Sequence, residues 1–261
     1  MKRLLVFIGI GILFLLISQE SVYAQKKSRK MLKAENAFAL EEYSKAADLY
    51  KEAYKKTKNK ALKVEIIFKQ GECYRLSGNI KRAETYYKRA IKAKYPDAIV
   101  YLKYADVLRM QGEYKEASEQ YTEYLLNAGM SKTEAEELIT QNKATENYIP
   151  GEMGLKSCAF ALKWKDVPTR YKVEIMPLVN SRNSDYSPAF GNGEYTELYF
   201  TSSRKGGLSD KIDNRTGEFF SDVYLTKLNK KGVWSDPVII PEPLNSEGNE
   251  GSVYLNNRGT L

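Results

Sequence analysis

The sequence has 261 residues, of which 28% are charged and 43% hydrophobic, and its formal net charge is +8. It contains no histidine, which excludes Ser-His-Asp and Cys-His nucleophile systems and nearly all catalytic zinc sites. Neither a Walker-type phosphate loop nor a GxSxG motif is present, so we expect a protein that is not an enzyme, with no cofactor and no bound metal.

The N-terminal segment 1–24 has the pattern of an export signal. Lys2 and Arg3 precede an apolar run over residues 4–17, which is shorter than the roughly 20 residues that a membrane-spanning helix needs. Val22 and Ala24 are small residues at the positions that decide cleavage, so we expect a cut after Ala24. An uncleaved membrane anchor is the alternative. Export disfavours nucleic acid as a partner.

Positive charge is concentrated between residues 26 and 97, where 20 Lys and Arg stand against 9 Asp and Glu. Two interpretations fit this excess. One is a site for an anionic surface, such as lipid headgroups or an acidic protein, and the other is a solvated helical face.

A motif of small and aromatic residues occurs three times. Ala46, Ala83 and Ala117 lie 37 and 34 residues apart (83 − 46 and 117 − 83), and a tyrosine follows each of them by four positions. A small residue lets two helices approach closely, and a tyrosine one turn later fills the space beside the contact. This pattern resembles the tetratricopeptide repeat (TPR) family over roughly residues 28–128.

The turns of the repeats carry a second signal. Gly78 and Gly112 fall between the two helices of a repeat, where a positive φ is often required. Tyr43, Ile80 and Tyr114 are expected to begin the second helix, helix B, of each repeat.

Two further helices are expected after the repeats. Residues 131–134 have the sequence of a capping box, which opens a helix to about Glu146 that covers the end of the array. A last helix follows over 154–164. Cys73 and Cys158 fall on different predicted helices and are interpreted as small buried side chains, with a long-range disulfide as the alternative.

The resemblance implies a partner-binding groove lined by the first helices, or A helices, of the repeats. The candidate groove residues occupy two positions of the repeat: Phe38, Arg75 and Arg109 at one, and Glu35, Glu72 and Asp106 at the other. Because arginine pairs with carboxylates through two parallel hydrogen bonds, these residues suggest a clamp for an extended or acidic partner segment. The alternative is pairing among these residues with no ligand.

From Tyr171 onward, short apolar runs alternate with turn residues, which is typical of β-structure. The predicted strands are 186–190, 197–201, 222–227, 238–240 and the beginning of a fifth at 251–255. Segments 184–190 and 197–204 resemble the WD40-like (TolB-type) β-propeller repeat. We therefore expect an α+β multidomain chain, with signal peptide 1–24, an all-α TPR array with capping helices over 28–165, and an incomplete all-β propeller segment over 166–261.

This propeller segment amounts to about one blade and the start of a second, whereas a propeller closes with four to eight blades. We expect a fragment of a longer protein; the alternative is a blade that packs on the helical array or is completed by a partner. The oxygen-rich loop 210–218 is interpreted as a solvated loop, with a calcium site as the less favoured alternative.

The order of signal peptide, TPR array and WD40-like segment resembles the periplasmic OmpA-family proteins of Bacteroidota, including the PorE-like proteins of type IX secretion. The resemblance implies a periplasmic scaffold associated with the outer membrane, with protein partners in the cell envelope. Peptidoglycan binding would require an OmpA-like domain, which this sequence lacks. The alternative function is a peptide- or glycan-binding accessory module of a larger envelope hydrolase.

Overall fold

The computed structural model describes residues 28–140, 149–167, 169–191 and 193–255. The predicted signal peptide and the end of the helix predicted to reach Glu146 lie outside these residues. Within the described part of the chain, no helix is both long enough and apolar enough to cross a membrane.

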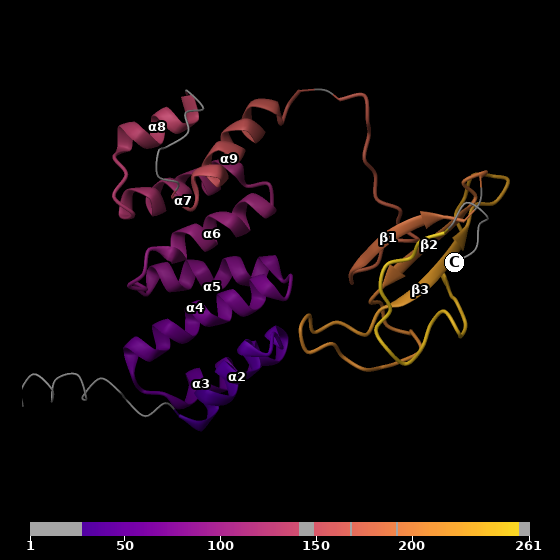
Figure 1. Ribbon diagram of the computed structural model, residues 1–261, viewed down its shortest axis with the longest axis horizontal. Helices are drawn as coiled ribbons and strands as arrows, with labels where there is room; N and C mark the ends of the chain where they lie inside the picture. The colour runs from indigo at the N-terminus through magenta and orange to yellow at the C-terminus, as the bar shows by residue number, and fades with distance from the viewer. Residues whose placement is uncertain (1–27, 141–148, 168, 192, 256–261) are drawn as a thin grey trace, which may run out of the picture.

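The N-terminal part is a stack of helical hairpins in which neighbouring helices pack side by side (Figure 1). Its helices are α2 Arg29–Ala39, α3 Tyr43–Lys56, α4 Lys60–Leu76, α5 Ile80–Lys92, α6 Ile99–Met110, α7 Tyr114–Asn127, α8 Lys132–Thr140 and α9 Glu152–Trp164. The three predicted starts of the B helices are confirmed, because α3, α5 and α7 begin at Tyr43, Ile80 and Tyr114.

The turn before each B helix passes through a left-handed residue. Gly78 and Gly112 both have φ +80, which confirms the predicted role of these glycines. In the first repeat Glu41 holds the corresponding turn at φ +59, a conformation that costs a residue with a side chain about 1 kcal/mol.

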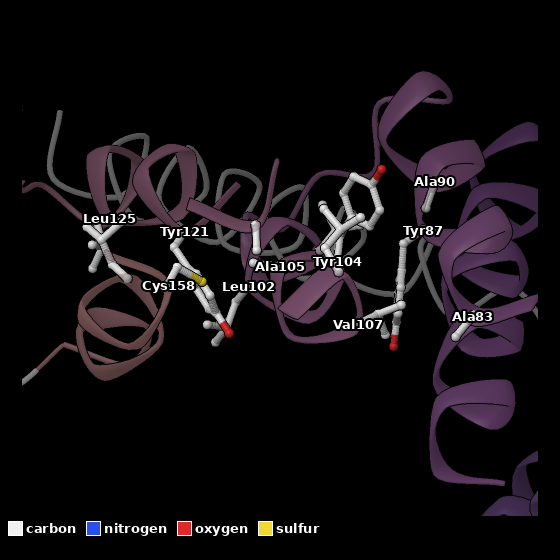
Figure 2. Close-up of a cluster of buried hydrophobic side chains, with 14 of the residues drawn as sticks. Ala83, Tyr87, Ala90, Leu102, Tyr104, Ala105, Val107, Tyr121, Leu125 and Cys158 are labelled. Atoms are coloured by element: carbon white, nitrogen blue, oxygen red, sulfur yellow. The ribbon is translucent and has the colours of Figure 1, made fainter. Parts of the chain in front are cut away.

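The core repeats the same tyrosine–alanine packing three times. Tyr50, Tyr87 and Tyr121 are among the largest fully buried side chains. Figure 2 shows the last two of them beside the small and aliphatic residues that surround them. Cys73 and Cys158 are both buried free thiols, which confirms their interpretation as small core side chains.

The end of the array differs from the expectation. The capping box is confirmed, since Glu134 N–H donates to Ser131 Oγ at 3.2 Å and Ser131 N–H donates to Glu134 Oε2 at 2.7 Å. However, α9 packs along α7 more extensively than α8 does. The predicted covering role therefore falls mainly to α9, where Gly154 lies directly against the ring of Tyr121.

The C-terminal part contains one antiparallel four-stranded sheet in the order β1-β2-β3-β4. The strands are β1 Asp185–Phe190, β2 Glu197–Ser202, β3 Asp222–Lys227 and β4 Val238–Ile239. The register between β1 and β2 shifts between Tyr186 and Ala189, a stretch that contains Pro188, which has no N–H to donate.

The predicted fifth strand is wrong. Residues 251–255 form no strand, and side chains of the sheet contact this segment instead: Thr201 Oγ1 donates to the carbonyl of Gly251 at 2.7 Å, and Ser187 Oγ donates to Ser252 Oγ at 2.8 Å. Contacts from side chains thus take the place of the backbone hydrogen bonds that a fifth strand would form with the sheet. The described residues form a single sheet, so a propeller is not shown.

Candidate protein-interaction surface

The candidate groove residues lie on α2, α4 and α6, the A helices of the three repeats. On α4 and α6 they recur at one spacing, because Asp106 follows Glu72 by the same interval as Arg109 follows Arg75 (106 − 72 = 109 − 75 = 34). Positions three apart on a helix lie on the same side, so α4 and α6 each present their acidic and their basic residue together.

Glu72 and Arg75 form a close ion pair within α4. Arg75 Nη2 lies 2.9 Å from Glu72 Oε2, and Arg75 Nε donates to Glu72 Oε1 at 3.2 Å. The hydroxyl of the fully buried Tyr87, on α5, donates to the same Glu72 Oε1. This carboxylate is therefore held from two helices of one repeat.

The electrostatics follow from these contacts. Burial raises the pKa of Glu72, but the hydrogen bonds from Arg75 and Tyr87 outweigh burial and hold the pKa below its usual value. The positive charge of Lys103 on α6 lowers the pKa of Glu72 further. Burial, followed by the neighbouring Glu72 charge, raises the pKa of Tyr87 far above its ordinary range, so Tyr87 acts as a donor.

The third repeat has the same residues in a looser arrangement. Tyr121 Oη donates to Asp106 Oδ1 at 2.7 Å and accepts from Arg109 Nε at 3.1 Å. Within the described residues, the hydroxyl of Tyr121 thus links Asp106 to Arg109. Arg109 is exposed, whereas Arg75 is half-buried.

The first repeat replaces the arginine by Phe38. Its ring packs edge-on against Tyr43 with the ring centroids 5.5 Å apart, and Lys69 Nζ of α4 lies 5.5 Å from the Phe38 ring centroid. Burial raises the pKa of the neighbouring Tyr50, with smaller contributions from Cys73 and Glu35. The charge of Glu35 thus contributes to the raised pKa of Tyr50, as the charge of Glu72 does to that of Tyr87.

Sequence reasoning missed two lysines of this surface. Lys69 and Lys103 lie three positions before Glu72 and Asp106, so they are separated by the same repeat interval (103 − 69 = 34). Applying the repeat spacing to basic residues as well as to alanines would have found them. With them, α4 and α6 each carry a basic, an acidic and a basic residue along one side, and the acidic one is engaged inside the repeat.

Loop 210–218 contains no metal-binding cluster. No group of His, Cys, Asp or Glu able to hold a metal occurs in the parts of the chain that the structure describes. Asp213 instead accepts from the Arg215 N–H at 2.7 Å and from Asn249 Nδ2 at 3.3 Å.

The family model of the tetratricopeptide repeat matches residues 31–99 and 68–131. These residues include α3–α7 and α2 from its third residue onward, so the helical part carries TPR repeats, a fold that mediates protein–protein interactions. A solved structure that resembles the chain is the TPR domain of Sgt2 from Aspergillus fumigatus, with 19% identity and a TM-score of 0.40 over 58% of this chain and 90% of that one. No curated protein matches the chain.

Proposed function

We propose that this protein is an exported, non-enzymatic scaffold of the bacterial cell envelope, whose A helices bind an extended acidic segment of a partner protein. The TPR repeats support a role in protein–protein interaction. The apolar leader over residues 4–17 supports export to the periplasm. The envelope complex that we favour is a secretion complex at the outer membrane, of the type IX kind.

One observation carries the choice of an acidic partner. The pattern basic–acidic–basic occurs on α4 as Lys69–Glu72–Arg75, and it recurs on α6 at the repeat spacing. Glu72 and Asp106 are already hydrogen-bonded within their repeats. The unbalanced charge on this side is therefore positive, and it suits carboxylates that are spaced like the helices.

The lysines are a cleaner probe of partner binding than Arg75. Arg75 is held by Glu72, and removing it would leave a half-buried carboxylate with fewer donors. Replacing Lys69 and Lys103 changes the charge of the surface and removes no hydrogen bond of the Glu72–Arg75 pair, on which Lys103 acts only through its charge. These two residues are therefore the sharper test of binding.

The test is capture of partners from crosslinked envelopes, with the wild type and with the double variant Lys69→Glu, Lys103→Glu. We expect the double variant to lose about tenfold or more of the specific partner. The control variant, Lys51→Glu with Lys115→Glu, makes the same charge change at exposed positions of α3 and α7. Equal capture by all three proteins, or an equal loss in both variants, would contradict the proposed surface.

A further inference from the structure

Helix α9 is apolar on two opposite sides. Leu155 and Cys158 face the array and are fully buried. On the other side, Met153, Phe160 and Trp164 are separated by seven and then four positions, a spacing that keeps them on one face of a helix.

This second face is open to solvent. The exposed fractions are 59% for Met153, 66% for Phe160 and 47% for Trp164, and Val167 in the following turn is 43% exposed. Here these four residues are called the α9 stripe. Contiguous exposed apolar side chains of this kind mark a surface that binds something.

The end of the α9 stripe combines aromatic rings with positive charge. The ring centroids of Phe160 and Trp164 are 6.0 Å apart, and Lys163 Nζ lies 5.7 Å from the Trp164 ring centroid. Lys165 and Arg170 follow, with Asp166 between them. The charge next to the stripe is thus net positive.

A second copy of the chain suits this face poorly. Lys163 lies about 60° to one side of Phe160 around the helix axis, at about 100° per residue. Two copies of α9 paired antiparallel about a twofold axis would place both Lys163 side chains along the same edge, where their charges repel. An anionic surface removes that repulsion.

We propose that the α9 stripe binds the surface of a membrane that contains anionic lipids. Phe160 and Trp164 would lie at the boundary between headgroups and acyl chains, where aromatic side chains are favoured. Lys163, Lys165 and Arg170 would lie among the lipid phosphates, with their aliphatic stems along the apolar boundary. The rest of the array would remain in water.

The sequence offers an internal probe for this contact. The chain has two tryptophans, and Trp234 lies between β3 and β4, where it packs against the small core of Val179 and Phe200. In a Trp234→Phe background, fluorescence therefore reports on Trp164 alone. The chain is used from Gln25 onward, which retains every described residue and removes the apolar leader.

The experiment titrates this protein with vesicles of phosphatidylcholine and with vesicles that also contain phosphatidylglycerol. We expect a blue shift of Trp164 emission and co-sedimentation with the anionic vesicles only. Phe160→Ser with Val167→Ser should weaken vesicle binding about tenfold or more without changing the charge. Lys163→Glu with Lys165→Glu should weaken it by a similar factor.

The matched control is Leu40→Ser with Met110→Ser, which removes two exposed apolar side chains elsewhere in the array and should leave vesicle binding unchanged. An equal loss in this control would overturn the proposal, because binding would then not depend on α9. No blue shift on anionic vesicles would also overturn it. So would a dimer in solution that disappears with Phe160→Ser, since the occupant of the stripe would then be a second copy.

Discussion

The Glu72 carboxylate keeps its charge inside a repeat because three donors on Arg75 and Tyr87 surround it. Its pKa in the folded chain lies below the ordinary value of 4.5. A carboxylate of this kind stabilises the fold above the pKa of the unfolded chain, and that contribution is lost as the pH falls through the folded pKa.

Glu72→Gln should therefore flatten the acid side of the stability profile. Between about pH 6 and about pH 3, we expect the free energy of unfolding to fall more steeply in the wild type than in this variant, because only the wild type loses the charged Glu72 contacts. Urea unfolding at a series of pH values, followed by circular dichroism, measures the difference. Glu119→Gln, at an exposed carboxylate of α7, should retain the wild-type slope. If the free energy of unfolding falls with pH in parallel for the wild type and Glu72→Gln, the Glu72 contacts do not contribute to the pH dependence of stability.

We expect removal of the Tyr87 hydroxyl and removal of the Tyr121 hydroxyl to lower the stability of the fold by unequal amounts. Tyr87→Phe leaves Glu72 paired with Arg75, whereas Tyr121→Phe removes the group that links Asp106 to Arg109. We expect Tyr121→Phe to lower the free energy of unfolding by about 1 to 2 kcal/mol and Tyr87→Phe to lower it by less. Denaturant unfolding of the two variants side by side tests this order, and a larger loss for Tyr87→Phe would contradict it.

At the scale of elements, α9 can pack closely on α7 because Gly154 has no side chain. A Cβ atom at Gly154 would lie 2.2 Å from Cζ of Tyr121, whose hydroxyl is held by Asp106. Alanine normally stabilises a helix interior by about 1 kcal/mol relative to glycine. Here the steric contact reverses the sign, because either α9 or the buried ring must move.

We expect Gly154→Ala to lower the free energy of unfolding by about 2 to 3 kcal/mol. Ser157→Ala, on the exposed side of the same helix, should change it by no more than about 0.5 kcal/mol. Both values come from urea unfolding monitored by far-ultraviolet circular dichroism. A Gly154→Ala protein as stable as the wild type would mean that α9 does not pack this closely on α7.

The helices that the sequence predicts best are those with local signals. The B helices begin where an aromatic or aliphatic residue follows a turn, and β3 spans the predicted residues 222–227 because its apolar pattern is bounded by turns. The covering role of α9 depends on a contact between Gly154 and Tyr121, which lie far apart in the chain, and no local pattern encodes it. The fifth strand has strand-like residues, but Thr201 and Ser187 bind that segment through side chains.

The candidate surface, like the fold, could be predicted from the sequence only in part. The repeat spacing identified Glu72, Arg75, Asp106 and Arg109 on the correct helices. It could not show that Tyr87 and Tyr121, from the B helices, engage the acidic members inside the repeats. That engagement depends on the packing of one helix on another, and it offsets the negative charge beside Lys69 and Lys103, the two lysines of the proposed surface.

At the scale of the molecule, the β2–β3 loop reaches back to the first repeat (Figure 1). The Ser44 N–H donates to the carbonyl of Asn214 at 3.0 Å, and Asn214 Nδ2 donates to Glu42 Oε1 at 3.0 Å. Helix α3 has no side-chain cap of its own at Glu42. The loop therefore satisfies N–H groups at the start of a helix that lies much earlier in the chain.

A pair of glycine variants separates this contact from backbone strain. Gly217 has φ +80, and a Cβ atom there would lie 2.4 Å from Ser44 Oγ. Gly232, in the β3–β4 turn, has φ +75, and its Cβ would meet no atom within 4 Å. Alanine at either position thus carries a similar conformational cost, of about 1 kcal/mol, but only the first displaces the loop from α3.

We expect Gly217→Ala to accelerate hydrogen exchange of the Ser44 and Lys45 amides by about tenfold, because their acceptors on the loop move away. Gly232→Ala should leave these two amides at the wild-type rate. Exchange followed by nuclear magnetic resonance resolves the individual amides. If both variants, or neither, change the exchange rates, the loop does not cap α3.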